Sequence, residues 1–133
     1  KYPRADYICI DAPEARVAIG DKYCDIETIV GQRLPERVRC QSIAVTHGGH
    51  GCYVWQPDRG VKRVPAFTKT IVDTVGAGDA FLAITAPLAA VGATMEQIGF
   101  IGNAAGAMKV GIVGHRASVE KVPLLKFLTT LLK

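Results

Sequence analysis

A glycine-rich turn in the second half of the chain constrains the fold more than any other segment. Residues 73–79 read DTVGAGD, and small apolar residues continue from there to Ala90. This run predicts a buried helix from Gly78 to Ala90 that approaches its neighbours closely and is kinked at Pro87. The chain therefore passes from a turn into a helix at Gly78, where the first helical N–H groups have no acceptor within the helix.

Strand signals dominate the sequence before this turn. Residues 7–10 (YICI) and 42–46 (SIAVT) are short β-prone runs typical of buried strands. The runs 52–55 and 61–64 enclose the turn-forming residues 57–60 (PDRG), which predicts an antiparallel hairpin. Core strands followed by a hairpin are therefore expected in this part of the chain.

Helix signals begin directly after the first predicted strand. Asp11 is followed by Pro13 and Glu14, the pattern of an acidic N-cap whose third helical residue completes a capping box. Residues 25–34 have apolar side chains at helical spacing, and Pro35 is expected to end that helix. A strand therefore runs directly into a helix at Asp11.

Further helices are predicted at 95–110 and 119–132. The second of these is amphipathic, and its predicted apolar stripe consists of Val122, Leu125, Leu128 and Leu132. Strands alternate with helices, and no repeat or flexible linker interrupts them. The sequence therefore predicts an α/β fold, a layered sheet flanked by helices, in one domain over residues 1–133.

Composition excludes several classes of protein. Apolar residues make up 49% of the chain and charged residues 21%, which is typical of globular domains and not of disordered or fibrous chains. The net charge of +4 comes from scattered basic residues, so no nucleic-acid partner is expected. The longest apolar stretch, 80–93, is too short to cross a bilayer, and no signal peptide is evident, so a cytoplasmic protein without a membrane partner is expected.

The cysteines are expected to be reduced side chains that pack in the core. They show no C-x-x-C spacing and no neighbouring histidine cluster of the kind that zinc requires. Because free cysteine packs readily among apolar side chains, neither a disulfide nor a metal is expected at Cys9, Cys24, Cys40 and Cys52.

The turn at 73–79 has the chemistry of an anion site. Its glycines let the backbone approach a ligand, and the amides from Gly76 through Ala77 and Gly78 to Asp79 lie at the positive end of the helix dipole. A carboxylate inside an anion site repels the ligand, so Asp79 makes sense as a general base that takes a proton from an attacking hydroxyl group. We therefore predict phosphoryl transfer at this turn.

Other interpretations of this turn fit less of the sequence. A dinucleotide-binding fingerprint requires a small residue three positions after Gly78, where the chain has Phe81. A Walker loop requires Lys-Ser or Lys-Thr after a suitable glycine pair, and none is present. A simple helix cap by Asp79 is the favoured interpretation when the glycines are considered alone, and only the resemblance of the longer segment decides against it.

The longer segment 73–81 (DTVGAGDAF) resembles the C-terminal signature of the ribokinase-like carbohydrate kinases, also called the PfkB family. This resemblance implies a ribokinase-like fold and an enzyme that uses ATP, with Mg²⁺, to phosphorylate a sugar or nucleoside. It further implies that Asp79 is the base, that the amides from Gly76 to Gly78 stabilise the transferred phosphoryl group, and that Asp73 contacts the nucleotide through Mg²⁺.

Two upstream elements carry the same resemblance. Asp11-Ala-Pro-Glu14 is similar to the family's N-x-x-E element, which implies that Asp11 and Glu14 organise Mg²⁺ and its waters, although Asp11 stands where the family usually has Asn. The family's T-x-G-x-x-G turn is matched by Thr46, Gly48 and Gly51, which implies that these residues border the nucleotide.

A downstream helix rich in alanine and glycine extends the resemblance. It contains Asn103 and ends near Val110, and it is similar to the family's adenine-side wall, which implies nucleotide contacts by both residues. Close helix packing explains its small residues equally well. Within the family, the segment 103–119 resembles the heptose-phosphate kinases of bacterial lipopolysaccharide precursor synthesis.

The resemblance covers nearly the whole chain, but family members are considerably longer. It implies that residues 1–133 are the C-terminal, nucleotide-binding and catalytic part of a kinase domain, without the N-terminal substrate-binding half and inactive alone. The implied partners are a nucleotide and a small-molecule sugar or sugar phosphate, and an uncovered sheet edge permits a homodimer. A non-catalytic nucleotide-binding or regulatory module of the same fold is the alternative.

Overall fold

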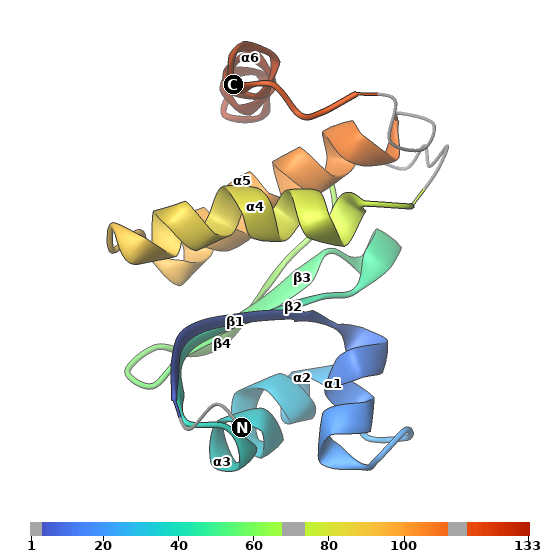
Figure 1. Cartoon of the computed structure of the whole chain (residues 1–133), viewed down its shortest axis with the longest axis vertical. Helices are drawn as coiled ribbons and strands as arrows, with labels where there is room; N and C mark the ends of the chain where they lie inside the picture. The colour runs from blue at the N-terminus through green and yellow to red at the C-terminus, as the bar shows by residue number, and fades with distance from the viewer. Residues whose placement is uncertain (1–3, 68–73, 112–116) are drawn as a thin grey trace.

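The predicted alternation of strands and helices folds as one sheet between layers of helices (Figure 1). The computed structural model describes residues 4–67, 74–111 and 117–133. Its strands are β1 (Ala5–Asp11), β2 (Cys40–Thr46), β3 (Cys52–Gln56) and β4 (Gly60–Val64). Its helices are α1 (Ala12–Ile19), α2 (Ile26–Thr28), the π-helical turn η1 (Ile29–Arg33), α3 (Leu34–Arg37), the 3₁₀ turn η2 (Gly48–His50), α4 (Ala77–Ala90), α5 (Met95–Val110) and α6 (Lys121–Leu131). The predicted α/β fold class is confirmed.

The sheet is mixed and has the strand order β1-β2-β3-β4. β1 and β2 are parallel, with Asp11 opposite Thr46, because the chain returns to β2 through helices and not through a hairpin. The β2–β3 and β3–β4 pairs are antiparallel, and the predicted turn near 57–60 joins β3 to β4. The carboxyl ends of β1 and β2 therefore lie side by side, and within the described residues β1 and β4 form the two edges of the sheet.

The predicted capping box at the start of α1 is confirmed. Asp11 Oδ1 accepts a hydrogen bond from the Glu14 N–H at 2.7 Å, and Glu14 Oε2 accepts one from the Asp11 N–H at 2.9 Å. This reciprocal cap satisfies N–H groups that the helix itself leaves without acceptors. The turn from β1 into α1 is therefore fixed by the two carboxylates that the sequence also singles out as metal-ligand candidates.

The second predicted helix continues past Pro35, so the expected end at this proline is wrong. α2, η1 and α3 form one helical stretch from Ile26 to Arg37, and Pro35 lies in the first turn of α3. A proline ring inside a regular helix clashes with the carbonyl group four residues earlier. In the wider turn of η1, the Leu34 N–H donates to the carbonyl group five residues earlier, Ile29 O. The hydrogen bonds therefore already depart from the regular α-helical pattern directly before Pro35.

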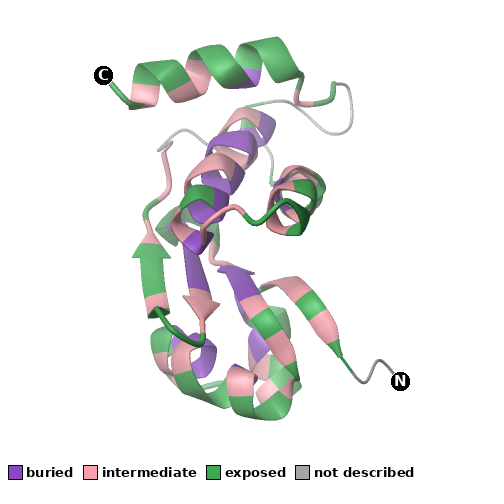
Figure 2. Ribbon diagram, turned by 90° about the vertical axis from the view of Figure 1, so that its left-hand side faces the viewer, coloured by how far each residue is buried: buried purple, intermediate pink, exposed green. Residues whose placement is uncertain are grey.

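Side chains alternate between the two faces of the sheet, and helices cover both faces. Ile43, Val45 and Tyr53 pack with the α1–α3 layer, whereas Ala44 and Val54 at intervening positions pack with α4 and α5. Figure 1 shows α1–α3 on one side of the sheet and α4 with α5 on the other. Figure 2 shows the buried residues gathered along α5 and in the strands next to it. The main core therefore lies in two layers, one on each face.

α4 is less buried than its small apolar residues predict. Its buried residues are Phe81 and Thr85, whereas Leu82 is 42% exposed. The ring of Phe81 packs over Gly102 of α5, where an added Cβ atom would lie 2.5 Å from the ring. The expectation of a buried helix is wrong because α4 packs against β1 and α5 on one side only, and its opposite side is exposed.

The apolar stripe of α6 differs from the predicted one. Val122, Leu125 and Leu132 are exposed, whereas Leu124 is buried against α5 together with the partly buried Phe127, Leu128 and Leu131. Both sets have helical spacing, because α6 carries apolar residues on more than one side. The position of α5 decided which set was buried, and periodicity alone does not contain that information.

Membrane insertion was excluded from the sequence by the length of its apolar stretch. Within the described ranges, none of the helices combines the length and the apolar character that a membrane crossing requires.

The cysteines are free and pack against apolar side chains. Burial is the main cause that raises the pKa of Cys52 to about 12 and the pKa of Cys9 to about 11. Both thiols are therefore protonated at neutral pH, and a protonated thiol is a poor nucleophile and metal ligand. Their packing is that of small hydrophobic residues, as predicted.

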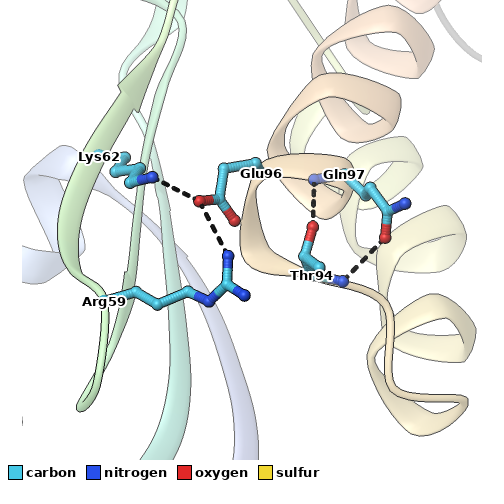
Figure 3. A network of polar contacts seen from close by, with 5 residues as sticks. All are labelled: Arg59, Lys62, Thr94, Glu96 and Gln97. Atoms are coloured by element: carbon cyan, nitrogen blue, oxygen red, sulfur yellow. Dashed lines mark hydrogen bonds and ion pairs between the residues drawn. The ribbon is translucent and has the colours of Figure 1, made fainter.

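The start of α5 is tied to the hairpin by a capping box and by ion pairs (Figure 3). Thr94 Oγ1 accepts a hydrogen bond from the Gln97 N–H, and Gln97 Oε1 accepts one from the Thr94 N–H. Lys62 Nζ donates to Glu96 Oε1 at 2.6 Å, and Arg59 Nη1 lies 3.6 Å from the same oxygen. The hydrogen bond from Lys62 is the main cause that lowers the pKa of Glu96. Glu96 also stabilises the helix because it lies near the positive end of the helix dipole.

Replacement of Gly102 by alanine should destabilise the fold. The added methyl group would meet the buried Phe81 ring at 2.5 Å, so the free energy of unfolding should fall by about 1–3 kcal/mol. Gly106→Ala is the matched control on the same helix, because no atom lies within 4 Å of its added Cβ, and it should be neutral or slightly stabilising. Urea denaturation followed by circular dichroism measures both variants, and equal stabilities would contradict the close packing of Phe81 on Gly102.

Glu96→Gln should remove a pH-dependent part of the stability. Because the pKa of Glu96 is lowered in the folded chain, its ion pairs stabilise the fold above the pKa of an unfolded glutamate. That contribution is lost as the pH falls through the lowered pKa. We expect a cost of about 0.5 kcal/mol at neutral pH, since partly exposed ion pairs contribute little, and no cost at a pH below the lowered pKa. Urea midpoints at both pH values measure it, and an equal cost at both would argue against the ion pairs.

Candidate functional site

A pocket of about 340 Å³ lies where the carboxyl ends of β1 and β2 meet the start of α4 and the second half of α5. Most of the residues predicted to form the site line this pocket: Asp11, Thr46, Gly48, Gly51, Ala77, Gly78, Asn103 and Val110. They come from both halves of the chain. The structure therefore brings the separate motifs together in one place, while their individual roles stay predictions.

The turn after β2 forms one side of the pocket. The His47 N–H donates to Gly51 O at 2.8 Å and closes the turn around η2. Gly51 has a φ of 93°, and an added Cβ atom would lie 2.1 Å from Val64 O, so no other residue fits at this position. Arg63 Nη2 donates to His50 O at 3.2 Å and joins the turn to β4. Thr46, Gly48 and Gly51 thus belong to one turn that backbone hydrogen bonds close and that Arg63 joins to β4.

Two histidines stand in this turn at positions that the motif leaves open. The rings of His47 and His50 have centroids 4.8 Å apart. Burial is the main cause that lowers the pKa of His47, and the nearby His50, Arg16 and Arg63 lower it further. His47 is therefore neutral at pH 7 and adds no positive charge to this side of the pocket.

The start of α4 forms the second side. Gly76 is the N-cap and adopts a left-handed conformation (φ 78°), and the Ala77 N–H donates to Thr74 O at 3.2 Å. The N–H groups of Gly78 and Asp79 precede the first full helical hydrogen bond and have no acceptor within the helix. Of the four amides predicted to form the anion site, the Ala77 amide is already bonded to Thr74 O, and the role of the others stays a prediction.

Asp79 and Gly76 flank the pocket and are not among the residues that line it. Asp79 is exposed and stands in the first turn of α4, directly after the pocket-lining Gly78. Its side chain is thus open to solvent. Asp79 follows the predicted anion-site residues directly along the chain, and its role as the base stays a prediction.

The two carboxylates at the start of α1 differ in position. Asp11 lines the pocket, whereas Glu14 does not. Their capping box uses one oxygen of each carboxylate, and the second oxygen of each takes no part in the cap. Carboxylate oxygens suit Mg²⁺, which keeps several waters and takes few protein ligands. No group of three or more potential metal ligands occurs among the described residues.

Asn103 lines the pocket, but its amide is engaged elsewhere. Asn103 Nδ2 donates to Val64 O at 2.9 Å and to Pro65 O at 3.0 Å, and the side chain is 9% exposed. The predicted contact between this amide group and a nucleotide base therefore competes with two backbone hydrogen bonds. Val110, at the end of α5, lies at the same side of the pocket.

Sequence reasoning missed part of the pocket. Ala66 and Phe67, which follow β4, line it, and the Phe67 ring packs edge-on against Phe100 with centroids 5.1 Å apart. No motif or periodicity marks these residues, because long-range contacts place them. Gly106 and Ala107 also line the pocket and belong to the small-residue helix that the sequence did single out.

One predicted site residue lies outside the described ranges. Asp73 falls in 68–73, and the segment 112–116, which contributes to the heptose-kinase resemblance, falls outside them as well. The predictions for these residues stay as the sequence makes them.

Sequence comparisons relate the chain to known kinases. The sequence profile described as "pfkB family carbohydrate kinase" matches residues 2–122. The bifunctional protein HldE of Methylococcus capsulatus is 32% identical over 116 residues, which make up 86% of this chain and 24% of that protein. A protein of Buchnera aphidicola described as an uncharacterized sugar kinase is 29% identical over 115 residues, 86% of this chain and 37% of that protein. The chain thus spans well under half the length of these relatives.

Solved structures share the fold over nearly the whole chain. Phosphofructokinase-2 from Escherichia coli in complex with potassium matches with a TM-score of 0.84 at 17% identity, covering 98% of this chain and 42% of that one. Ribokinase from Arabidopsis thaliana complexed with ribose and ATP matches with a TM-score of 0.79 at 21% identity, covering 92% of this chain and 40% of that one. The fold of the chain is therefore ribokinase-like.

Proposed function

The chain belongs to the pfkB family of carbohydrate kinases, and from this premise we propose that it binds ATP in the pocket and phosphorylates a hydroxyl group of a sugar or sugar phosphate. One observation carries the proposal. The unbonded amides at the start of α4, the turn that ends at Gly51 and the small residues of α5 meet at a single pocket beside Asp79. Phosphoryl transfer needs this combination of positioning, anion stabilisation and one proton acceptor.

In the proposed reaction Asp79 acts on the acceptor at the mouth of the pocket. Its carboxylate takes the proton of the acceptor hydroxyl group while that oxygen bonds to the γ-phosphorus of ATP, and the bond from the γ-phosphorus to the bridging oxygen breaks to release ADP. The amides of Gly78 and Asp79 donate to the phosphoryl oxygens as negative charge develops on them. Asp11 and Glu14 would hold Mg²⁺ through its water shell, where the ion supplies further charge neutralisation.

The acceptor is proposed to be a sugar phosphate of the heptose class. The bifunctional protein HldE of several bacteria is similar to this chain, which supports the resemblance of residues 103–119 to heptose-phosphate kinases. Most sugar-binding groups would come from polypeptide outside the part of the relatives that this chain matches, because the match covers 24% of the HldE protein of Methylococcus capsulatus. We propose that such polypeptide packs at an edge of the sheet, β1 or β4, and that the chain alone does not turn over. A second copy of the chain at that edge would instead form a homodimer.

A non-catalytic nucleotide-binding module is the second candidate. It is favoured by Asp11, which stands where the family usually has Asn and which could disturb the phosphates by its charge. Such a module would bind nucleotide without transferring phosphate.

Mg-ADP and Mg-ATP should stabilise the chain, and Gly106→Val should abolish this effect. The added side chain would enter open space at the pocket wall, where no atom lies within 4 Å of an added Cβ, and would occupy volume that the nucleotide needs. The exposed Ala90→Val at the end of α4 is the matched control and should keep the full thermal shift. A thermal-shift assay with and without nucleotide measures this. An unchanged melting temperature of the unsubstituted chain in saturating Mg-ATP would rule out the proposed nucleotide site.

Asp79→Asn should lower kcat by about 10²–10⁴-fold in the complete kinase that contains this chain, because an amide cannot accept the proton of the acceptor. Nucleotide affinity should be retained or rise slightly, since a negative charge beside the phosphates is removed. Phosphorylation of sugar phosphates, coupled to ADP release, measures turnover, and calorimetry measures affinity. The exposed Asp58→Asn in the hairpin turn is the control. Near-normal turnover of Asp79→Asn would refute the role of the base, whereas nucleotide binding without any turnover in the unsubstituted protein would favour the non-catalytic module.

A further inference from the structure

The backbone segment Val64–Phe67, called the wall segment below, leaves β4 and forms one wall of the pocket. Ala66 and Phe67 line the pocket, and no regular strand or helix holds them, because β4 ends at Val64. Its position must therefore come from side-chain and backbone contacts with neighbouring elements. Those contacts identify the residues that determine the width of the pocket at this point.

Asn103 makes the most specific of these contacts. Its amide nitrogen donates to two consecutive carbonyl groups, Val64 O at 2.9 Å and Pro65 O at 3.0 Å. Both N–H bonds of the Nδ2 group are thus used, and both acceptors lie immediately before the pocket-lining Ala66. Because the side chain is 9% exposed, these hydrogen bonds compete weakly with water.

The turn at Gly51 supports the wall segment from the other side. An added Cβ at Gly51 would lie 2.1 Å from Val64 O and 2.7 Å from both Pro65 C and Ala66 N. The turn after β2 therefore lies against Val64 and Pro65, whose carbonyl groups Asn103 binds from α5, and against Ala66, which follows them. Beyond them, the Phe67 ring packs edge-on against Phe100, one turn before Asn103 on α5.

We propose that Asn103 is a positioning residue that clamps the wall segment and thereby sets the width of the slot between Ala66–Phe67 and Gly106–Ala107. The inference rests on the proposed function, in which the planar base of the nucleotide occupies this slot. Asn103 affects the binding of the base through the position of the wall segment. Its amide group makes no hydrogen bond with the base itself in this proposal.

Clamping and direct reading of the base have different consequences. If Asn103 sets only the slot width, loss of its amide weakens the binding of every nucleotide that has a base of similar size. The affinities for ATP and GTP then fall by the same factor. Inorganic tripolyphosphate, which has no base, keeps its affinity, because the amides of Gly78 and Asp79 are untouched. If the amide contacted the base directly, its removal would change the ratio of ATP to GTP affinity.

Asn103→Asp and Asn103→Ala test the clamp. The aspartate keeps the size of the side chain but places a carboxylate against two carbonyl oxygens, and the alanine removes both donors. We expect each variant to lose about tenfold in affinity for ATP and for GTP alike, with tripolyphosphate binding unchanged, as measured by calorimetry on the chain. A changed ATP-to-GTP ratio, an equal loss for tripolyphosphate, or unchanged affinities would each overturn the clamp.

Hydrogen exchange provides a measurement that does not depend on nucleotide. Without a ligand, the amide hydrogens of Ala66 and Phe67 should exchange faster in both Asn103 variants than in the unsubstituted chain. Unchanged exchange rates at these two residues would overturn the clamp even if no nucleotide binds. Failure of the unsubstituted chain to bind any of the three ligands would refute the proposed function separately.

Thr85→Val is the control for general loss of stability. Thr85 Oγ1 donates to Phe81 O at 2.8 Å and accepts from Tyr7 Oη at 2.9 Å, so this variant also removes buried hydrogen bonds. Its side chain does not line the pocket. It should lower the melting temperature and leave the affinities and the exchange at Ala66 and Phe67 unchanged. If Thr85→Val changed the nucleotide affinities and the exchange at Ala66 and Phe67 as the Asn103 variants do, general loss of stability would explain the Asn103 effects. That result would overturn the clamp.

Discussion

The close approach of α5 to its neighbours is the constraint on which the pocket depends. Because Gly102 has no side chain, the ring of Phe81 packs directly on α5, and α4 can lie close to that helix. The next residue, Asn103, donates to the backbone at the end of β4, and Gly106, one turn further on, lines the pocket. Because a rigid helix carries all three positions, the α4 packing, the position of the wall segment and the pocket width change together if α5 moves.

Features that depend on short-range hydrogen bonds could be predicted from the sequence. The capping box at Asp11 and the bounds of α5 follow from residues a few positions apart, and both are confirmed. Features that depend on distant partners could not be predicted. Pro35 was expected to end a helix because the π-helical turn before it leaves no pattern in the sequence. The stripe on α6 was wrong because two sets of apolar residues have helical spacing, and only the position of α5 selects Leu124.

The candidate site also combines features that the sequence predicts with features that depend on distant residues. Thr46 and Asp11 come from motifs at the ends of two parallel strands, and the carboxyl ends of neighbouring parallel strands meet at one edge of a sheet. Their proximity in the pocket could therefore be expected once the strands were recognised. Ala66 and Phe67 were missed because Gly51 and Asn103, distant in sequence, place them there. A motif identifies the residues that touch a ligand, and it contains no information on the backbone that those residues hold in place.

The two aspartates at the helix starts show how local geometry separates the roles of identical side chains. Asp11 is an N-cap, and one of its carboxylate oxygens is bound to the Glu14 N–H, so part of its hydrogen-bonding capacity stabilises α1. At α4 the N-cap is Gly76, which has no side chain to use in this way, and Asp79 stands three residues later in the first turn. The helix therefore begins without using the Asp79 carboxylate. A glycine N-cap therefore leaves the Asp79 carboxylate outside the cap, which is compatible with the general-base role that we propose for it.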